Sequence, residues 1–278
     1  MFPRSVERAR RAGFCAGVRR AVGMAQDLIR EPAGDLVMWG ALIHNAHVVS
    51  ELERGGMRVV ETLDGLRGGE TVLIRAHGIA PDLRRQIMDR GCRIVDASCP
   101  FVLKIHALVS EAAAAGKRVF ITGDPRHPEV EGIVGAAGGT ATVLSSVADV
   151  ESLAPWQGKA VLVSQTTFSV VIFREIVDNL SRKIALLEIF DTICEATENR
   201  QLEARRMAER NDVMLVIGSR TSSNTMKLVD VCKSASRATY LIEDADAVRG
   251  LLSAGAFADR RIGVTAGAST PDSMILEV

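Results

Sequence analysis

The chain alternates short apolar runs with amphipathic segments, a pattern that predicts strands and helices in turn. A helical period covers residues 16–30, and an apolar run follows at residues 36–40. Further apolar runs lie at 71–75 and 93–96, with a helical pattern between them at 81–90. Short apolar runs between helices are typical of parallel sheets with helices on both faces. The sequence therefore predicts an α/β protein with mostly parallel sheets.

The same order of elements recurs three times, each time from a cysteine. The passes begin at Cys15, Cys99 and Cys194, and the first two end in a strand before the next cysteine. The third pass has no such strand, and the segment before Cys15 stands where that strand belongs. An internal repeat of this kind predicts three similar small α/β units. Their ranges are residues 15–98, 99–193 and 194–278, the last completed by residues 1–14.

Histidines follow the predicted strands at matching places. In parallel α/β sheets functional groups collect at the carboxyl ends of strands. His44, His77 and His127 all follow strand patterns, and residues 124–132 are predicted to form a loop before a strand at 140–145. A single histidine is more often an ordinary side chain than a ligand, whereas three at equivalent strand ends indicate a site.

Three cysteines stand between a strand pattern and a helix pattern, namely Cys15, Cys99 and Cys194. The amides and the positive dipole end of a helix start lower the pKa of a thiol, so these positions favour thiolates. Three thiolates suit a cluster with one iron that lacks a protein ligand, because four cysteines normally hold a complete four-iron cluster. The alternative is that a cysteine fills core space, and we prefer it for Cys92 and Cys232.

Hydroxyl and amide side chains stand at predicted helix starts, which attract phosphate. They are Ser222, Ser223 and Asn224 in TSSNT and Ser269 in GAS. The same residue types cap helices without any ligand, so both interpretations stay open. For proton transfer the sequence offers Thr166 at a strand end and the carboxyls of Glu129 and Glu131. A plain surface carboxylate is the default for Glu129, and the choice between the two carboxyls needs geometry.

The composition argues against proteins that bind nucleic acid or a membrane. Lys plus Arg and Asp plus Glu both number 34, so the net charge gives no argument for binding nucleic acid or an anionic membrane. No apolar stretch reaches the length of a membrane span, and residues 1–14 contain no apolar leader segment. Five cysteines in such a chain indicate thiols or metal ligands. We therefore expect a cytoplasmic protein that binds neither nucleic acid nor a membrane.

Nine segments resemble, in order and over nearly the whole chain, motifs of the 4-hydroxy-3-methylbut-2-enyl diphosphate reductase family. They are GFCAGVRRA, IHNAHVV, AHGI, DASCP with KIH, HPEVEG, SQTTFS, DTICEAT with RQ, GSRTSSNT and GVTAGASTPD. The resemblance implies a pseudo-three-fold trefoil of three α/β units around one 4Fe-4S cluster on Cys15, Cys99 and Cys194. It also implies that the open iron binds the substrate hydroxyl. The implied diphosphate ligands are His44, His77, Ser222, Ser223, Asn224 and Ser269, with His127 nearby.

The implied reaction is reductive dehydroxylation of (E)-4-hydroxy-3-methylbut-2-enyl diphosphate to isopentenyl and dimethylallyl diphosphates, the last step of the non-mevalonate isoprenoid pathway. Glu129 would deliver protons with help from Thr166. Because no glycine-rich dinucleotide fingerprint follows a strand, we expect electrons from a ferredoxin or flavodoxin. The alternatives are a non-redox iron-sulfur hydro-lyase, a zinc hydrolase and an inactive cluster-binding paralogue. The complete set of proton-handling and phosphate-binding candidates argues against the inactive paralogue.

Overall fold

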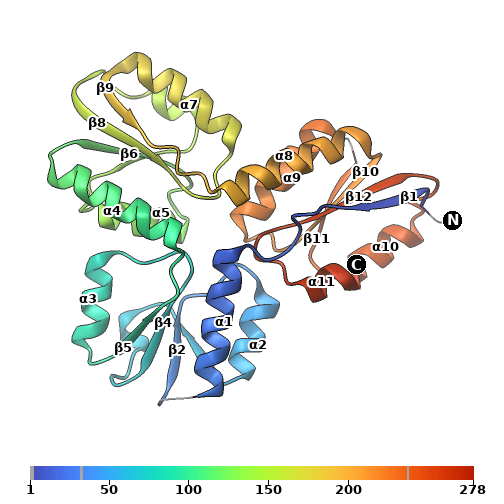
Figure 1. The fold of residues 1–278 in the computed structure, drawn as a ribbon, viewed down its shortest axis with the longest axis horizontal. Helices are drawn as coiled ribbons and strands as arrows, with labels where there is room; N and C mark the ends of the chain where they lie inside the picture. Colours follow the sequence, from blue (N-terminus) through green and yellow to red (C-terminus); the bar gives the residue numbers. More distant parts are fainter. Residues whose placement is uncertain (1–2, 32–33, 237) are drawn as a thin grey trace. The chain divides into compact units, whose positions relative to one another are not determined.

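The structure is a computed structural model and describes residues 3–31, 34–236 and 238–278. The chain gathers into two compact units. Figure 1 colours the chain along its sequence, from blue at the N-terminus to red at the C-terminus. The first unit comprises Met1–Arg19, Ile43–Ser50 and Glu195–Val278, and the second comprises Arg20–Leu42 and Glu51–Cys194. Within the described residues no helix is both long and apolar enough to cross a membrane.

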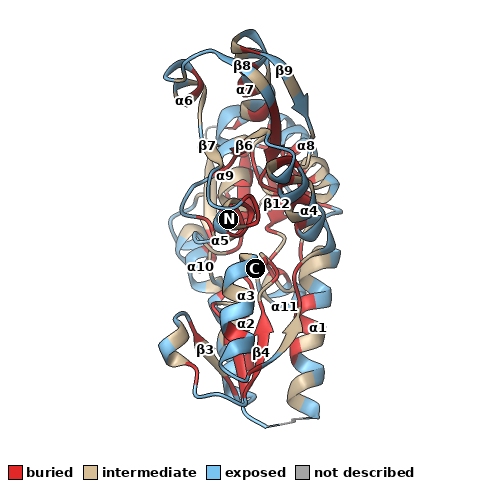
Figure 2. Cartoon of the chain, turned by 90° about the vertical axis from the view of Figure 1, so that its left-hand side faces the viewer, coloured by how far each residue is buried: buried red, intermediate tan, exposed pale blue. Residues whose placement is uncertain are grey.

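The second unit contains two four-stranded parallel sheets. In one, the order β3, β2, β4, β5 is formed by Met57–Val60, Leu36–Trp39, Thr71–Ile74 and Arg93–Asp96. In the other, the order β7, β6, β8, β9 is formed by Thr142–Leu144, Arg118–Thr122, Trp156–Ser164 and Ile184–Ile189. Strands β2 and β4 are buried along their whole length, as β4 shows in red in Figure 2. Burial on both faces explains why these strands read as continuous apolar runs.

Helices connect these strands. Helices α1 (Ala16–Arg30) and α2 (Ala46–Arg54) begin in the first unit and continue into the second. The remaining elements of the second unit are the 3₁₀ helix η1 (Leu63–Gly65), α3 (Pro81–Asp89), α4 (Pro100–Ala114), α5 (Pro128–Ala136), α6 (Val147–Glu151) and α7 (Val170–Lys183). One apolar cluster joins α4, α5 and the sheet through Ile105, Val130 and Ile121. The helices that follow Cys99 and His127 are thus fixed to the same core.

The first unit contains the third parallel sheet. Its order β11, β10, β12, β1 is formed by Thr239–Ile242, Val213–Ile217, Arg261–Ala266 and Ser5–Arg8. The helices are α8 (Glu195–Arg210), α9 (Ser223–Ala235), α10 (Ala245–Ser253) and α11 (Asp272–Glu277). Apolar clusters lie on both faces of this sheet, one lined by Leu215 and Val264 and the other by Met214 and Val216.

The three sheets share one arrangement, in which β2, β6 and β10 each lie between the next two strands of the sequence. All pairs are parallel, which confirms the predicted α/β class with parallel sheets. β1 occupies in the third sheet the place that β5 and β9 occupy in the others. It is an edge strand with mostly exposed side chains, so the sequence needs no apolar run there. Residues 1–2 of the predicted closing segment lie outside the described residues. The unit boundaries at Cys99 and Cys194 stay a prediction.

One prediction is wrong, because residues 128–132 of the loop expected at 124–132 belong to helix α5 (Pro128–Ala136). Two prolines and one glycine in that segment favour a loop at the level of sequence. Pro128, however, occupies the first helical turn, where the missing N–H does no harm. Gly132 and Gly135 are sites of close approach, since a Cβ on Gly135 would lie 2.3 Å from the Cβ of Ala80. The glycines therefore serve packing here and do not interrupt the helix.

Candidate active site

Cys15 in the first unit and Cys99 and Cys194 in the second are held in the same way, each by a hydrogen bond inside its unit. The backbone N–H of each donates to a carbonyl two residues beyond the end of a neighbouring strand, β12, β4 or β8. The pairs are Cys15 with Ala268 at 3.2 Å, Cys99 with Ala76 at 2.9 Å, and Cys194 with Thr166 at 3.0 Å. Helices α1, α4 and α8 begin at the next residue in each case. The repeat predicted from sequence thus recurs at the level of single hydrogen bonds.

The environment of these cysteines suits an iron-sulfur cluster. All five cysteines are thiols, and Cys15, Cys99 and Cys194 are partly exposed. The Val18 N–H donates to the Sγ of Cys15 at 3.4 Å, so this sulfur faces the first turn of helix α1. By contrast, Cys92 and Cys232 are buried, and burial raises the pKa of the Cys232 thiol to about 12. The partly exposed thiols at helix starts thus fit an iron-sulfur cluster in their chemistry, whereas Cys92 and Cys232 are buried, as expected for cysteines that fill core space.

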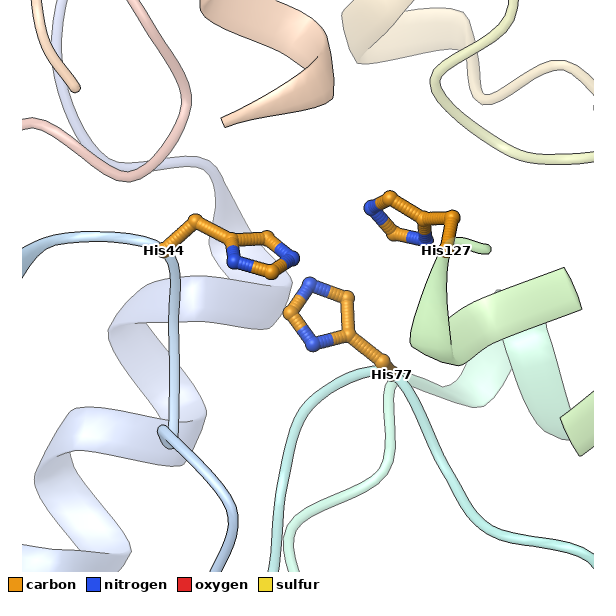
Figure 3. Close-up of side chains that lie close together, drawn as sticks. All are labelled: His44, His77 and His127. Carbon is orange, nitrogen blue, oxygen red and sulfur yellow. The ribbon is translucent and has the colours of Figure 1, made fainter. Parts of the chain in front are cut away.

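In the first unit, polar groups gather at the start of α9. Ser222 caps this helix, since its Oγ accepts from the Thr225 N–H at 3.3 Å. The Oγ of Ser269 lies 3.2 Å from the Oγ of Ser222 and donates to the carbonyl of His44 at 3.2 Å. The structure therefore brings three predicted site residues together around one helix N-terminus, with Ser223 as the first residue of that helix. Figure 3 shows the side chain of His44, which belongs to the first unit.

Asn224 is the second residue of α9 and only 3% exposed. Among the described residues, neither its Nδ2 nor its Oδ1 has a hydrogen-bond partner. Leaving such a buried amide without partners costs about 1–3 kcal/mol, so a polar ligand at this position would remove a real penalty. The backbone nearby is tightly packed, because a Cβ on Gly267 would lie 2.1 Å from the Oγ1 of Thr225. A capped helix start with an unsatisfied amide is suited to bind an anion.

In the second unit, Glu129 is the second residue of α5 and only 1% exposed. Its Oε1 accepts from the Thr166 N–H at 2.6 Å, and its Oε2 accepts from the Thr166 hydroxyl at 2.8 Å. Burial raises the pKa of Glu129 from 4.5 to about 7, and the hydrogen bonds from Thr166 offset part of that rise. Glu131 is exposed. The surface alternative for Glu129 is therefore wrong, and geometry favours Glu129 over Glu131 as the acid.

His127 caps α5 and orients its ring by doing so. Its Nδ1 accepts from the Glu129 N–H at 3.2 Å, so the neutral ring carries its proton on Nε2. The ring of His77 meets that of His127 edge to face, with centroids 5.2 Å apart and an interplanar angle of 88° (Figure 3). His77 directly follows Ala76, whose carbonyl holds Cys99. Two imidazoles and a buried carboxyl thus lie beside one cysteine loop.

Thr166 connects the acid to a second cysteine. Its side chain and N–H hold Glu129, while its carbonyl accepts from the N–H of Cys194. Thr192 supports the same loop, because its hydroxyl donates to the carbonyl of Ser164 and accepts from its N–H, both at 2.7 Å. Sequence analysis missed Thr192, although its place two residues before Cys194 in DTICEAT was the available signal.

Arg200 plays a comparable supporting part in the first unit and was also missed. It is 6% exposed and donates to the carbonyls of Gly13 at 2.7 Å and Ala266 at 3.3 Å. It also donates to the carbonyl of Arg11. The guanidinium therefore ties the segment before Cys15 to the end of β12. The arginine in DTICEATENRQ is visible in the sequence, but the carbonyls it binds lie far away along the chain.

The parallel sheets carry three partly exposed thiols before helix starts, a capped helix start with an unsatisfied amide, and a buried carboxyl. This combination is typical of an α/β enzyme. The sequence model of the LytB protein family matches residues 6–278. The chain belongs to this family, and membership implies an iron-sulfur cofactor.

Relatives and solved structures agree on this family. The chain is 41% identical over 273 residues to the 4-hydroxy-3-methylbut-2-enyl diphosphate reductase of Caldanaerobacter subterraneus subsp. tengcongensis, covering 97% of this chain and 93% of that protein. It is 40% identical over 270 residues to the reductase of the same name from Geobacter sulfurreducens, covering 97% and 94%.

Among solved structures, the E-1-hydroxy-2-methyl-but-2-enyl-4-diphosphate reductase from Plasmodium falciparum matches with a TM-score of 0.93 and 28% identity, covering 99% of this chain and 86% of that one. A structure described as (E)-4-hydroxy-3-methyl-but-2-enyl diphosphate reductase, the terminal enzyme of the non-mevalonate pathway, matches with a TM-score of 0.70 and 32% identity, covering 99% and 97%.

Proposed function

We propose that this chain converts (E)-4-hydroxy-3-methylbut-2-enyl diphosphate into isopentenyl and dimethylallyl diphosphates, the final step of the non-mevalonate pathway. Two electrons and two protons remove the hydroxyl group as water. The observation that carries the proposal is Glu129, a fully buried carboxyl whose pKa is raised to about 7. An acid of that strength is half protonated near neutral pH, which suits proton delivery to a leaving hydroxyl group. The names of the relatives supply the substrate.

The proposed cofactor is one 4Fe-4S cluster held by Cys15, Cys99 and Cys194. Their partial exposure, their positions before helix starts and the matching hydrogen bonds of their amides support this ligand set. When bound, the cluster supplies single electrons and a Lewis-acidic iron. The convergence of all three sulfurs stays a prediction, since Cys15 belongs to the first unit and the other two to the second.

The proposed diphosphate ligands come from both units. In the first unit they are His44, Ser222, Ser223, Asn224 and Ser269, and in the second they are His77 and His127. The capped start of α9 offers amides, hydroxyls and the amide side chain of Asn224, all uncharged donors. The proton on Nε2 of His127 makes its ring a donor as well.

The proposed proton path runs through Glu129 and Thr166. A carboxyl near a diphosphate keeps its proton more strongly, because a second negative charge raises its pKa further. Thr166 holds both carboxyl oxygens, so it fixes the direction in which the acid presents its proton. The Thr166 carbonyl also accepts from the N–H of Cys194, so this one residue fixes the position of Glu129 relative to the Cys194 loop.

The proposed electron donor is a ferredoxin or flavodoxin, and the proposed location is the cytoplasm. No glycine-rich dinucleotide fingerprint follows a strand in this chain, so a bound nicotinamide is not expected to supply the electrons.

Anaerobic turnover tests the proposed function directly. The purified protein, reconstituted with iron and sulfide, is mixed with the allylic diphosphate with and without dithionite and a viologen, and products are measured by mass spectrometry. We expect both five-carbon diphosphates only when the reductant is present. Consumption of substrate without reductant, to a product that has lost or gained water and is neither of the two five-carbon diphosphates, would favour the hydro-lyase. No consumption of substrate by the iron-loaded protein in the presence of reductant would contradict the proposal.

A further inference from the structure

His106 on α4 is wedged between two glycines that lie far apart in the sequence. A Cβ on Gly132 of α5 would lie 3.2 Å from both Cε1 and Nε2 of the His106 ring. A Cβ on Gly78 would lie 3.3 Å from the Cε1 of the same ring. Such distances are shorter than ordinary van der Waals contact, so the imidazole packs against both segments and leaves no room for a side chain at either glycine. A Cβ at either position would require the ring to move by a few tenths of an ångström.

The two glycines belong to the segments that carry the candidate site residues of the second unit. Gly78 follows His77 directly, and Gly132 lies one helical turn after Glu129. The helix that carries His106 begins immediately after Cys99. A single ring therefore contacts the His77 turn and helix α5, and belongs to the helix that starts at the cysteine.

We infer that His106 is a positioning residue whose ring sets the spacing between the His77 turn and helix α5, and so the placement of His77, His127 and Glu129. This inference rests on the proposed function for its kinetic consequences. The spacing itself does not depend on any bound group, because His106, Gly78 and Gly132 all belong to the second unit. The edge-to-face pair of His77 and His127 is the geometry that the spacing protects.

The polar atoms of the ring agree with a packing role. The Nε2 of His106 is buried and has no hydrogen-bond partner among the described residues. Burial lowers the pKa of His106, and the charge of Asp96 opposes this only in part, so the ring is neutral. A neutral ring in van der Waals contact on two sides acts through its shape.

A double-mutant cycle between His106→Ala and Gly132→Ala tests the inference. The kcat and KM of the anaerobically reduced holoenzyme are measured for the allylic diphosphate, together with the melting temperature of each variant. The matched control is Gly23→Ala in α1, because a Cβ there meets nothing within 4 Å. Alanine is otherwise favoured over glycine inside a helix, so any loss in Gly132→Ala comes from the contact with the ring.

We expect Gly132→Ala to lower kcat/KM about tenfold, because a small misplacement of binding and catalytic groups is costly. In His106→Ala the space is open, so adding Gly132→Ala should cause no further loss, which makes the two effects strongly non-additive. Coupling seen in the melting temperature alone, with kinetic constants of all variants at the wild-type level, would overturn the inference. Additive kinetic losses would overturn it as well. If the wild-type holoenzyme itself fails to turn over, it is the proposed function that fails.

Discussion

Two buried helix starts, one in each unit, occupy equivalent places and differ in one decisive residue. Ser222 caps α9 and His127 caps α5, each by accepting a backbone N–H. The second helical residue is Asn224 in the first case and Glu129 in the second, and they are 3% and 1% exposed. An amide at this position gives a helix start suited to an anion. A carboxyl at the same position gives an acid.

The comparison also shows which force dominates at α5. The positive end of a helix dipole favours a carboxylate at the second residue and so lowers its pKa. Burial acts in the opposite direction, and the pKa of Glu129 nevertheless rises to about 7. Desolvation therefore outweighs the dipole and the two hydrogen bonds from Thr166. The same local scaffold supports binding or proton transfer according to one side chain and its exposure to water.

The largest effect is expected from removing the proposed cofactor. Cys194→Ser replaces a soft thiolate with a hydroxyl that binds iron poorly. We expect the iron and sulfide content and the brown absorption to fall sharply, with turnover below detection. The matched control is Cys92→Ala, which removes a buried thiol and should leave the cluster in place. A Cys194→Ser protein with a full cluster would contradict the ligand assignment.

The next largest effect is expected from Glu129→Gln, which keeps the shape of the acid but removes its proton. Turnover should fall by about 10²- to 10⁴-fold, the usual contribution of a general acid. Substrate affinity, measured by titration of the cluster spectrum, should be unchanged. In the wild type, turnover should decline as pH rises above about 7, because Glu129 then loses its proton.

Glu131→Gln is the matched control for that experiment, since Glu131 is an exposed carboxyl on the same helix. It should turn over at the wild-type rate. Near-normal turnover in Glu129→Gln together with a loss in Glu131→Gln would reverse the assignment. Loss of binding in Glu129→Gln would instead show that this side chain organises the site.

A smaller effect, and one on binding, is expected at the α9 start. Asn224→Ala should raise KM about 10- to 100-fold with little change in kcat, because hydrogen bonds to charged groups contribute about 1.5–3 kcal/mol. Asn224→Asp makes this helix start resemble that of α5 and should weaken binding further by repelling the diphosphate. Asn179→Ala on α7 serves as the control. An unchanged KM in Asn224→Ala would remove this residue from the anion site.

The last effect is expected on stability, without any change in the binding site. Because the folded-state pKa of Glu129 lies above 4.5, the folded protein binds more protons than the unfolded chain between about pH 4.5 and 7. The contribution of this residue to the free energy of unfolding therefore falls as pH rises through that range, by up to about 3 kcal/mol. Glu129→Gln should flatten this part of the pH dependence in urea unfolding. An identical pH dependence in both proteins would show that the carboxyl titrates normally.

Sequence patterns predicted the sheets well because buried parallel strands leave continuous apolar runs, as in β2 and β4. They did not show β1 as a strand, since an exposed edge strand needs no apolar pattern. They also missed α5, where glycines that allow contact with His106 and Ala80 looked like loop residues.

The sequence showed which residue types make up the candidate site, but not which residues hydrogen-bond to one another. The motif SQTT identified Thr166, yet nothing local shows that Thr166 holds both Glu129 and Cys194. The choice between Glu129 and Glu131 depends on which side of α5 faces the core. Arg200 was missed for a similar reason, because its acceptors at Gly13 and Ala266 are distant in sequence.

The central claim is that Glu129 is an acid that burial keeps protonated near neutral pH. Infrared difference spectroscopy of the wild type against Glu129→Gln, between pH 5 and 8, measures this without relying on turnover. We predict a protonated-carboxyl stretching band that titrates away at about pH 7 and is absent from the variant. A Glu129 that is already ionised at pH 5, with no difference band between the two proteins, would contradict the account.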